Sequence, residues 1–214
     1  TALVPNLEGA IRAVEHGINS ISVITAASEN FSLKNTNCSI NKSIEKISEI
    51  IDYAQEHDIK IRTYISTCWD CPYTGIIKPK MVKLIIDHLY QFEIIREFVL
   101  SDTTGKATAE SVQYLMDILF TEFDPSNFAL HFHDTFGQAE DNLWCGLNNG
   151  ITTFDSSTGG IGGCPFSPGA KGNIASHKAV SIINDLGFST GINKAKLDDA
   201  GIFINSAISN IQIS

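Results

Sequence analysis

The sequence lacks any apolar run that approaches the ~18 residues of a membrane-spanning helix. It also lacks a cluster of basic residues: 15 Lys and Arg residues stand against 24 Asp and Glu residues, for a formal net charge of −9. An acidic chain without a basic cluster is poorly suited to bind nucleic acid or an anionic membrane. We therefore predict a small-molecule partner, with no nucleic acid and no membrane.

Cysteine is sparse, and its five residues are scattered and odd in number, at Cys38, Cys68, Cys71, Cys145 and Cys164. A secreted disulfide scaffold would be shorter and richer in cysteine, so we predict a reducing compartment and a protein that is not secreted. The sequence opens at Thr1 without the basic and apolar segments of a signal peptide. It also opens without Met, which leads us to expect a lost upstream segment.

Disorder is excluded, because 43% of the residues are hydrophobic and 18% are charged, the balance of a globular protein. Short apolar segments alternate with longer amphipathic ones along the chain, which is typical of an α/β fold with buried parallel strands. We predict strands at 20–27, 59–67, 97–100, 128–132 and 151–155, and helices at 7–16, 39–57, 80–92, 109–120, 138–148 and 176–186.

Doubly wound sheets and (β/α)8 barrels both fit this alternation. No glycine-rich nucleotide-binding motif follows the early strands, which removes the main support for the doubly wound nucleotide-binding fold. Polar residues gather where strands end, for example at 101–103, 133–135 and 155–157. Barrel enzymes keep their chemistry at that edge, so we favour a TIM (β/α)8 barrel.

The sharpest local motif is His131-Phe132-His133-Asp134 at the end of a predicted strand. Because side chains alternate along a strand, His131 and His133 project to the same face. Two imidazoles so placed can share one metal ion. The alternative is that both are ordinary polar residues that close the strand.

Three further features are candidates for function. Cys164 lies in the glycine-rich segment 159–172, where a thiol can be accessible, although a merely flexible or phosphate-binding loop is the alternative. Asp102 follows a strand and could be an acid, a group that supports a metal ligand, or a helix cap with Thr103. The pair Cys68 and Cys71 resembles half of a zinc or redox site, but no second CxxC exists and we interpret both as packing residues.

Together these segments resemble the 3-hydroxy-3-methylglutaryl-CoA (HMG-CoA) lyases, members of the HMGL-like group of metal-dependent barrel enzymes that also holds isopropylmalate and homocitrate synthases. The resemblance covers nearly the whole chain, 1–214, as a single domain. It rests on the segments 3–9, 26–29, 35–39, 71–75, 101–105, 131–138 and 155–157, and on the Gly-Gly-Cys-Pro loop followed by Gly172-Asn173. That loop is more specific than the rest, because the related synthases lack its cysteine.

The resemblance implies an enzyme that cleaves HMG-CoA, an acyl-CoA, to acetyl-CoA and acetoacetate, in leucine degradation and ketone-body formation. It implies a divalent metal, Mg²⁺ or Mn²⁺, held by His131, His133 and Asn173. It further implies proton transfer by Cys164, a catalytic contribution from His131, and second-rank places near the site for Asp102 and Tyr64. A homodimer, in a bacterial cytoplasm or a mitochondrial matrix, is expected.

One departure from the family pattern stands out. The family's first barrel strand carries an Arg-Asp pair, in which the Asp is a metal ligand and the Arg stabilises the enolate, and its second strand carries a Glu. We find about six family strands, so we expect the first one to two βα units to be absent from this chain. Two alternatives stay open: a related acyl-CoA Claisen synthase or aldolase with the same HxH metal site, and an inactive, truncated remnant.

Overall fold

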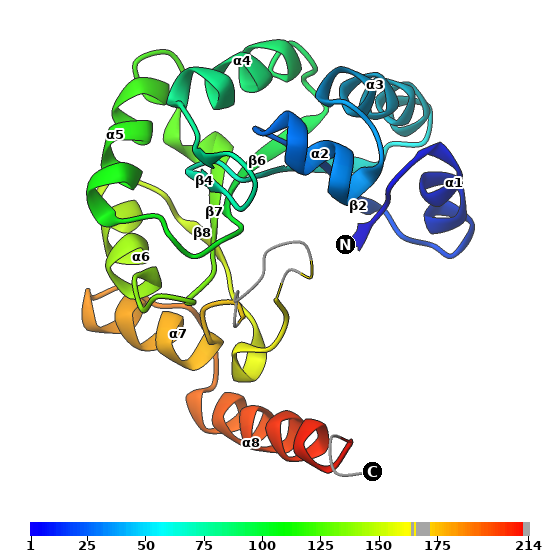
Figure 1. The fold of residues 1–214 in the computed structure, drawn as a ribbon. Coiled ribbons are helices and arrows are strands. Elements are labelled where there is room, and N and C mark those ends of the chain that lie inside the picture. The colour runs from blue at the N-terminus through cyan, green and yellow to red at the C-terminus, as the bar shows by residue number, and fades with distance from the viewer. Residues whose placement is uncertain (164, 166–171, 212–214) are drawn as a thin grey trace.

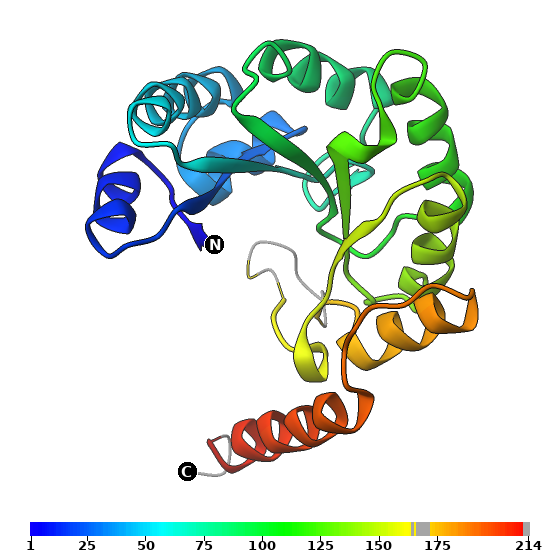
Figure 2. The same cartoon turned by 180° about the vertical axis from the view of Figure 1, so that it is seen from behind.

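The computed structural model describes residues 1–163, 165 and 172–211. Six parallel strands form one sheet in the order β1-β2-β3-β6-β7-β8. Their bounds are β1 (Ala2–Leu3), β2 (Ser20–Ala26), β3 (Lys60–Ser66), β6 (Ile95–Asp102), β7 (Phe128–Phe132) and β8 (Thr153–Asp155). The sheet curls into an open arc, with β1 and β8 at its two edges (Figures 1 and 2). This open arc of six parallel strands confirms the prediction of an α/β barrel fold with about six strands.

Helices cover the outer, convex face of the arc (Figure 1). They are α1 (Leu7–Glu15), α3 (Ile40–Glu56), α4 (Pro79–Leu89), α5 (Ala109–Leu119), α6 (Ala139–Asn148) and α7 (Ser176–Asp185). The sequence patterns predict all six within a few residues of these bounds. The helix starts have local causes: the Ser39 hydroxyl accepts the backbone N–H of Lys42 at 3.1 Å, and Thr108 and Ser111 form a capping box before α5.

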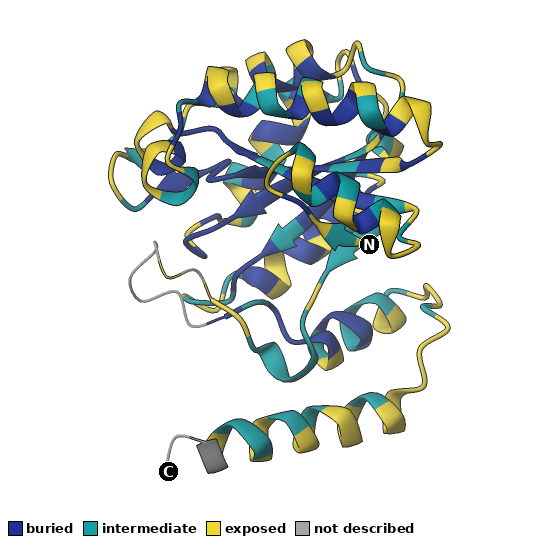
Figure 3. Ribbon diagram, turned by 90° about the vertical axis from the view of Figure 1, so that its right-hand side faces the viewer, coloured by how far each residue is buried: buried dark blue, intermediate teal, exposed yellow. Residues whose placement is uncertain are grey.

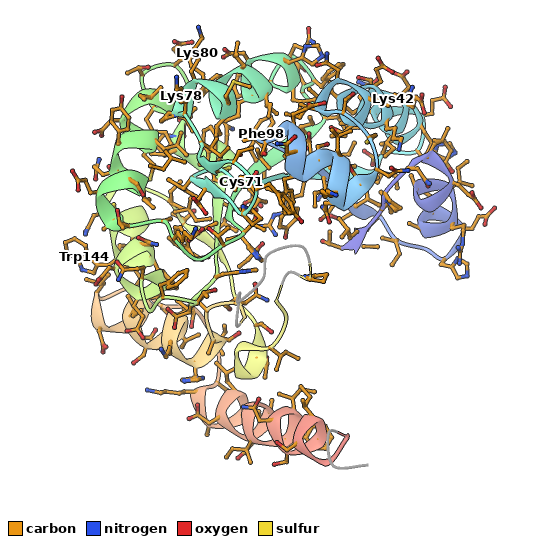
Figure 4. The ribbon with its side chains drawn as sticks, viewed as in Figure 1. Lys42, Cys71, Lys78, Lys80, Phe98 and Trp144 are labelled. Carbon is orange, nitrogen blue, oxygen red and sulfur yellow. The ribbon has the colours of Figure 1, made fainter. Side chains whose placement is uncertain are left out.

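The main core lies between the sheet and these helices. Alternate strand residues point outward into it and are almost completely buried, among them Phe98, Leu100, Leu130 and Phe132. Burial of each such side chain stabilises the fold by about 1.5–3 kcal/mol. The helices accordingly show buried inner faces and exposed outer faces (Figure 3). Lys42, Lys80 and Trp144 project from the outer surface of these helices (Figure 4).

The sequence patterns missed several elements. These are β1, α2 (Glu29–Thr36), the hairpin of β4 (Asp70–Cys71) and β5 (Gly75–Ile76), the short helices at Pro125–Asn127 and Thr158–Gly160, and α8 (Lys194–Ile211). Helix α2 is only weakly amphipathic, so its periodicity gave little signal. Strand β6 is also longer than the predicted 97–100.

Cys71 lies in the hairpin of β4 and β5, and Cys68 lies just before it. Each is about 1% exposed and free of a disulfide. The interpretation of both as packing residues is confirmed. Within the described part of the chain, no helix combines the length and the apolar character that crossing a membrane requires.

Candidate active site

A cavity of about 530 Å³ lies at the carboxyl edge of the sheet, on the concave side of the arc. Strand residues that alternate with the core residues line it, because successive side chains of a strand point to opposite faces. Most of its polar lining comes from four strands and from the segments that follow them: Ser22, Arg62, Tyr64, Ser66, Ser101, Thr103, His131, His133 and Asn173. Polar groups from distant parts of the chain therefore converge where barrel enzymes keep their chemistry.

His131 and His133 both line this cavity, as the alternation of the strand predicted. Their ring centroids lie 5.4 Å apart. Burial, and then the nearby His131, lower the pKa of His133 to about 4, so its imidazole is neutral at physiological pH with a free lone pair. Nδ1 of His133 is buried and meets no hydrogen-bond partner among the described residues.

Asn173 lies beside His133 because the segment 172–174 pairs with the chain that follows β7. The backbone N–H of Asp134 donates to the carbonyl of Gly172 at 3.0 Å, and that of Ile174 donates to Phe132 at 3.0 Å. The Asn173 amide nitrogen donates to the carbonyl oxygens of Ile161 and Gly162 at 3.0 and 3.1 Å. These two bonds fix the orientation of the amide. Its oxygen, Oδ1, is buried and has no partner within the described ranges.

These three residues fit a divalent cation in donor chemistry. Two imidazoles and one amide oxygen border one cavity, and such mixed nitrogen and oxygen ligation suits several divalent ions. The buried, unpartnered atoms of His133 and Asn173 would gain a partner. Among the described residues, no group of three or more His, Cys, Asp and Glu side chains is placed to hold a metal. The candidate set therefore depends on the amide of Asn173.

Cys164 lies outside the described residues. Its described neighbours Gly163 and Pro165 both line the cavity, as does Gly162.

Asp102 has a different environment from the histidines. It stands opposite Phe132 in the sheet, on the core side of β6, while Ser101 stands opposite His131 on the cavity side. Its carboxylate accepts the backbone N–H groups of Gly105, Lys106 and Ala107 at 2.9–3.2 Å. Burial raises its pKa to about 6, against the lowering effect of these bonds.

Asp102 thus holds the loop that follows β6. The cap of α5 is Thr108 instead, so the interpretation of Asp102 as a helix cap is wrong. Its catalytic role stays a prediction.

The sequence patterns largely missed a second group of polar side chains on the cavity side, which is centred on Asp155. Asp155 accepts hydrogen bonds from Arg62 Nη1 at 2.7 Å and from the Tyr64 hydroxyl at 2.7 Å, and it contacts Nδ1 of His131 at 3.2 Å. Arg62 also donates through Nε to Glu97, which faces it in the sheet. Burial alone would raise the pKa of Asp155, but its hydrogen-bonding partners lower it to about 2.

The signal for this group was present in the alternation. Arg62 and Tyr64 are two residues apart on β3 and share a face, and Tyr64 was already a second-rank candidate. The pairing of β7 with β8 places Asp155 opposite His131. That register depends on strands 24 residues or more apart, so no local motif shows it.

Comparison with known proteins places these observations in a family. Residues 1–204 match the family model described as HMGL-like. A lyase from Pseudomonas aeruginosa, named as acting on 3-hydroxy-3-isohexenylglutaryl-CoA and hydroxymethylglutaryl-CoA, is 41% identical over 94% of this chain and 66% of its own length. The human cytoplasmic HMG-CoA lyase is 41% identical over 96% of this chain and 55% of its own length. Other relatives include a mitochondrial lyase.

The solved structure of the Bacillus subtilis HMG-CoA lyase superposes with a TM-score of 0.93 at 36% identity, covering 99% of this chain and 73% of that one. The chain spans 55–66% of the length of the two curated relatives described above. Its open arc of strands agrees in fold with the matching part of the solved lyase. The family model covers most of the chain, and this chain therefore belongs to the HMGL-like family.

Proposed function

We propose that this protein is a metal-dependent carbon–carbon lyase that cleaves HMG-CoA to acetyl-CoA and acetoacetate, a step of leucine degradation and ketone-body formation. The observation that carries the proposal is the convergence of His131, His133 and Asn173 on one cavity, in a chain of the HMGL-like family. The relatives named as HMG-CoA lyases support the choice of substrate.

The proposed metal ligands are Nε2 or Nδ1 atoms of His131 and His133 and Oδ1 of Asn173, with Mg²⁺ or Mn²⁺ as the ion. A divalent cation bound there would polarise the tertiary hydroxyl of the substrate and lower its pKa. Neutral imidazoles are the form that binds a metal, and burial keeps His133 neutral. The unpartnered oxygen of Asn173 supports its inclusion.

Cleavage requires removal of the hydroxyl proton, breakage of the carbon–carbon bond, and delivery of a proton to the acetyl-CoA enolate. We assign that delivery to Cys164, on the strength of the family resemblance and of the neighbouring residues Gly163 and Pro165, which line the cavity. His131 is included in the catalytic set because it borders the cavity next to His133. We propose that Asp102 acts indirectly, by holding the loop 104–107.

The proposal extends to the setting of the enzyme. We expect an acyl-CoA as the small-molecule partner, a homodimer as the assembly, and a bacterial cytoplasm or a mitochondrial matrix as the compartment. The relatives named as cytoplasmic and as mitochondrial support these two compartments.

The test is to incubate the purified full-length protein, with any segment encoded upstream of Thr1, with HMG-CoA and Mg²⁺ or Mn²⁺ and to measure acetoacetate. Release that EDTA abolishes and added Mn²⁺ restores supports the proposal. His133→Ala should remove activity and Mn²⁺ binding together. His177→Ala is the matched control, because His177 is exposed on α7 and does not line the cavity, and it should change neither.

Two results would overturn the proposal. Condensation of acetyl-CoA with an oxo acid, without cleavage of HMG-CoA, would favour the related Claisen synthases. A chain that shows a folded circular dichroism spectrum but neither activity would favour an inactive remnant.

For Cys164, we expect Cys164→Ser to reduce turnover severely at nearly unchanged Mn²⁺ affinity. An equal loss of turnover and of Mn²⁺ affinity would contradict its proton-transfer role.

A further inference from the structure

Asp155 is the meeting point of a hydrogen-bonded group that reaches one of the proposed metal ligands. Arg62 and Tyr64 come from β3, His131 from β7 and Asp155 from β8. All four side chains are partly buried on the cavity side, and those of Arg62, His131 and Asp155 are only about one-fifth exposed. Water is thus partly excluded from the contacts, which strengthens charge-assisted hydrogen bonds.

Both oxygens of the Asp155 carboxylate are engaged. Oδ1 accepts from Arg62 Nη1 at 2.7 Å. Oδ2 accepts from the Tyr64 hydroxyl at 2.7 Å and lies 3.2 Å from Nδ1 of His131. An ionised carboxylate has no proton to donate, so the proton of the contact with His131 belongs to the imidazole. Nδ1 of His131 therefore carries the proton of this contact, and Nε2 is the nitrogen left to offer a lone pair to a metal.

The position of Asp155 is itself restrained from the other side. Arg62 binds Asp155 through one nitrogen and Glu97 through another, and its guanidinium lies 5.2 Å from the centre of the Tyr64 ring. Arg62 also donates to the Tyr64 hydroxyl at 2.8 Å. Rotation of the Asp155 carboxylate would therefore break bonds to two residues that are held in place by others.

We propose that Asp155 is a positioning residue for His131: restrained by Arg62 and Tyr64, its carboxylate holds the imidazole in the Nδ1–H tautomer and presents Nε2 as the metal-binding atom. The metal-binding part rests on the proposed function, whereas the tautomer is a property of the metal-free protein. Carboxylates that accept the second N–H of a metal-ligating histidine fix its ring and tautomer in this way, and their loss typically costs 10–100-fold in metal affinity.

Asp155→Asn gives a specific expectation. The amide oxygen should remain with the Arg62 guanidinium, because an NH₂ group there would face another donor. The amide nitrogen then faces Tyr64 and His131 and favours acceptance by Nδ1, which moves the imidazole proton to Nε2. An analogous Asp-to-Asn change in a catalytic triad stabilises the wrong histidine tautomer.

The experiment is long-range ¹H–¹⁵N NMR of the full, metal-free chain labelled with ¹⁵N-histidine, with the His131 signals assigned through His131→Gln. The wild type should show the Nδ1–H tautomer and Asp155→Asn the Nε2–H tautomer. Mn²⁺ titration followed by electron paramagnetic resonance should show a 10–100-fold weaker Kd for Asp155→Asn. Glu97→Gln is the matched control, because Glu97 binds Arg62 without contacting His131, and it should keep the wild-type tautomer.

An Nε2–H tautomer in the wild type would overturn the proposal even if the variant failed to fold. An unchanged Nδ1–H tautomer in a folded Asp155→Asn variant would overturn it as well. A wild type with the Nδ1–H tautomer, lost in Asp155→Asn, but with no affinity for Mn²⁺ would support the positioning role and count against the metal-dependent function. The experiment therefore distinguishes failure of the positioning role of Asp155 from failure of the metal-dependent function.

Discussion

Gly172→Ala should weaken metal binding far more than it weakens the fold. Gly172 has a φ of +146°, and a Cβ built on it would lie 2.2 Å from the carbonyl oxygen of Gly160. Carbon–oxygen contacts of this kind normally lie at about 3.3–3.6 Å, so the segments must separate by about 1 Å. The obstacle is backbone, which has no flexible end that can swing aside.

The separation acts directly on Asn173. Its backbone N–H donates to Gly162, and its side-chain amide donates to Ile161 and Gly162, all across the gap that would widen. Loss of one or two such bonds costs about 1 kcal/mol each. Because 1.4 kcal/mol is a factor of ten, we expect Mn²⁺ affinity to fall about 10-fold or more as the Asn173 oxygen loses its orientation.

The fold should tolerate the change, because the clash between residues 172 and 160 lies beside the cavity, and of the segment 172–174 only Ile174 belongs to the main core. Strain at a residue forced into such a conformation is about 1–3 kcal/mol, which corresponds to a fall in Tm of several degrees for a chain of this size. Gly17→Ala is the matched control: Gly17 also has a positive φ, +76°, but a Cβ there meets no atom within 4 Å among the described residues. It should lower Tm and leave Mn²⁺ affinity unchanged.

The assays are thermal unfolding by circular dichroism and Mn²⁺ titration by isothermal calorimetry. A Gly172→Ala variant that binds Mn²⁺ as tightly as the wild type would refute the reasoning, because the approach of the two segments would then have no part in orienting Asn173. Equal losses of affinity in Gly172→Ala and Gly17→Ala would refute it too, since strain alone would explain both.

Three further predictions concern the buried polar groups. The raised pKa of Asp102, about 6, means that the folded state retains a proton longer than the unfolded state; its contribution to stability is complete below pH ~4, is lost as pH rises through 6, and amounts to about 2–3 kcal/mol. The lowered pKa of His133 contributes the opposite slope between pH 4 and 6.5, in the wild type and in Asp102→Asn alike. The test is therefore the difference in free energy of unfolding between the wild type and Asp102→Asn, which urea unfolding should show to fall between pH 4 and 7. Arg62→Met should cost about 3–5 kcal/mol in urea unfolding, because it leaves the partly buried carboxylates of Glu97 and Asp155 without their shared cation; a loss below 1 kcal/mol would contradict this. Alkylation of Cys68 should follow global unfolding, since burial raises the pKa of its thiol far above the usual range; mass spectrometry that finds it modified in native buffer would count against the packed position.

The strands and most helices were predictable because each carries its own signal. A buried parallel strand is continuously apolar, and α3 repeats its isoleucines at helical intervals. Helix α2 was missed because the residues Glu29–Thr36 lack such a stripe, although Ser28 caps it by accepting the N–H of Phe31 at 3.3 Å. Helix α8 was missed as well; its inner face, at Leu197, Gly201 and Ile204, is only partly buried, and its Ile202 and Phe203 are 68% and 73% exposed.

The candidate site was predictable only in part, for a related reason. The motif of His131 and His133 is local, and strand alternation alone placed both rings on one face. Asn173 came from family resemblance, because its place beside His133 depends on a pairing across 40 residues. Asp155 and Arg62 were missed because their contact depends on the curvature and order of the whole sheet. The alternation along β6 also places Asp102 on the core side of the sheet, which its position after an apolar strand does not show.

The alternation of side chains between the two faces of each strand links the packing of the core to the geometry of the site. The residues that pack against the helices and those that face the cavity alternate on the same strands, so a slip of one residue in register would exchange them. The apolar set Phe98, Leu100, Leu130 and Phe132 would then face the cavity, and the polar set Arg62, Ser101, His131 and Asp155 would enter the core. Burial of the first set therefore selects the register that brings the second set together. It follows that cavity-side substitutions such as Asp155→Asn can change the site while the core keeps the register, whereas core substitutions on the same strands should disturb both.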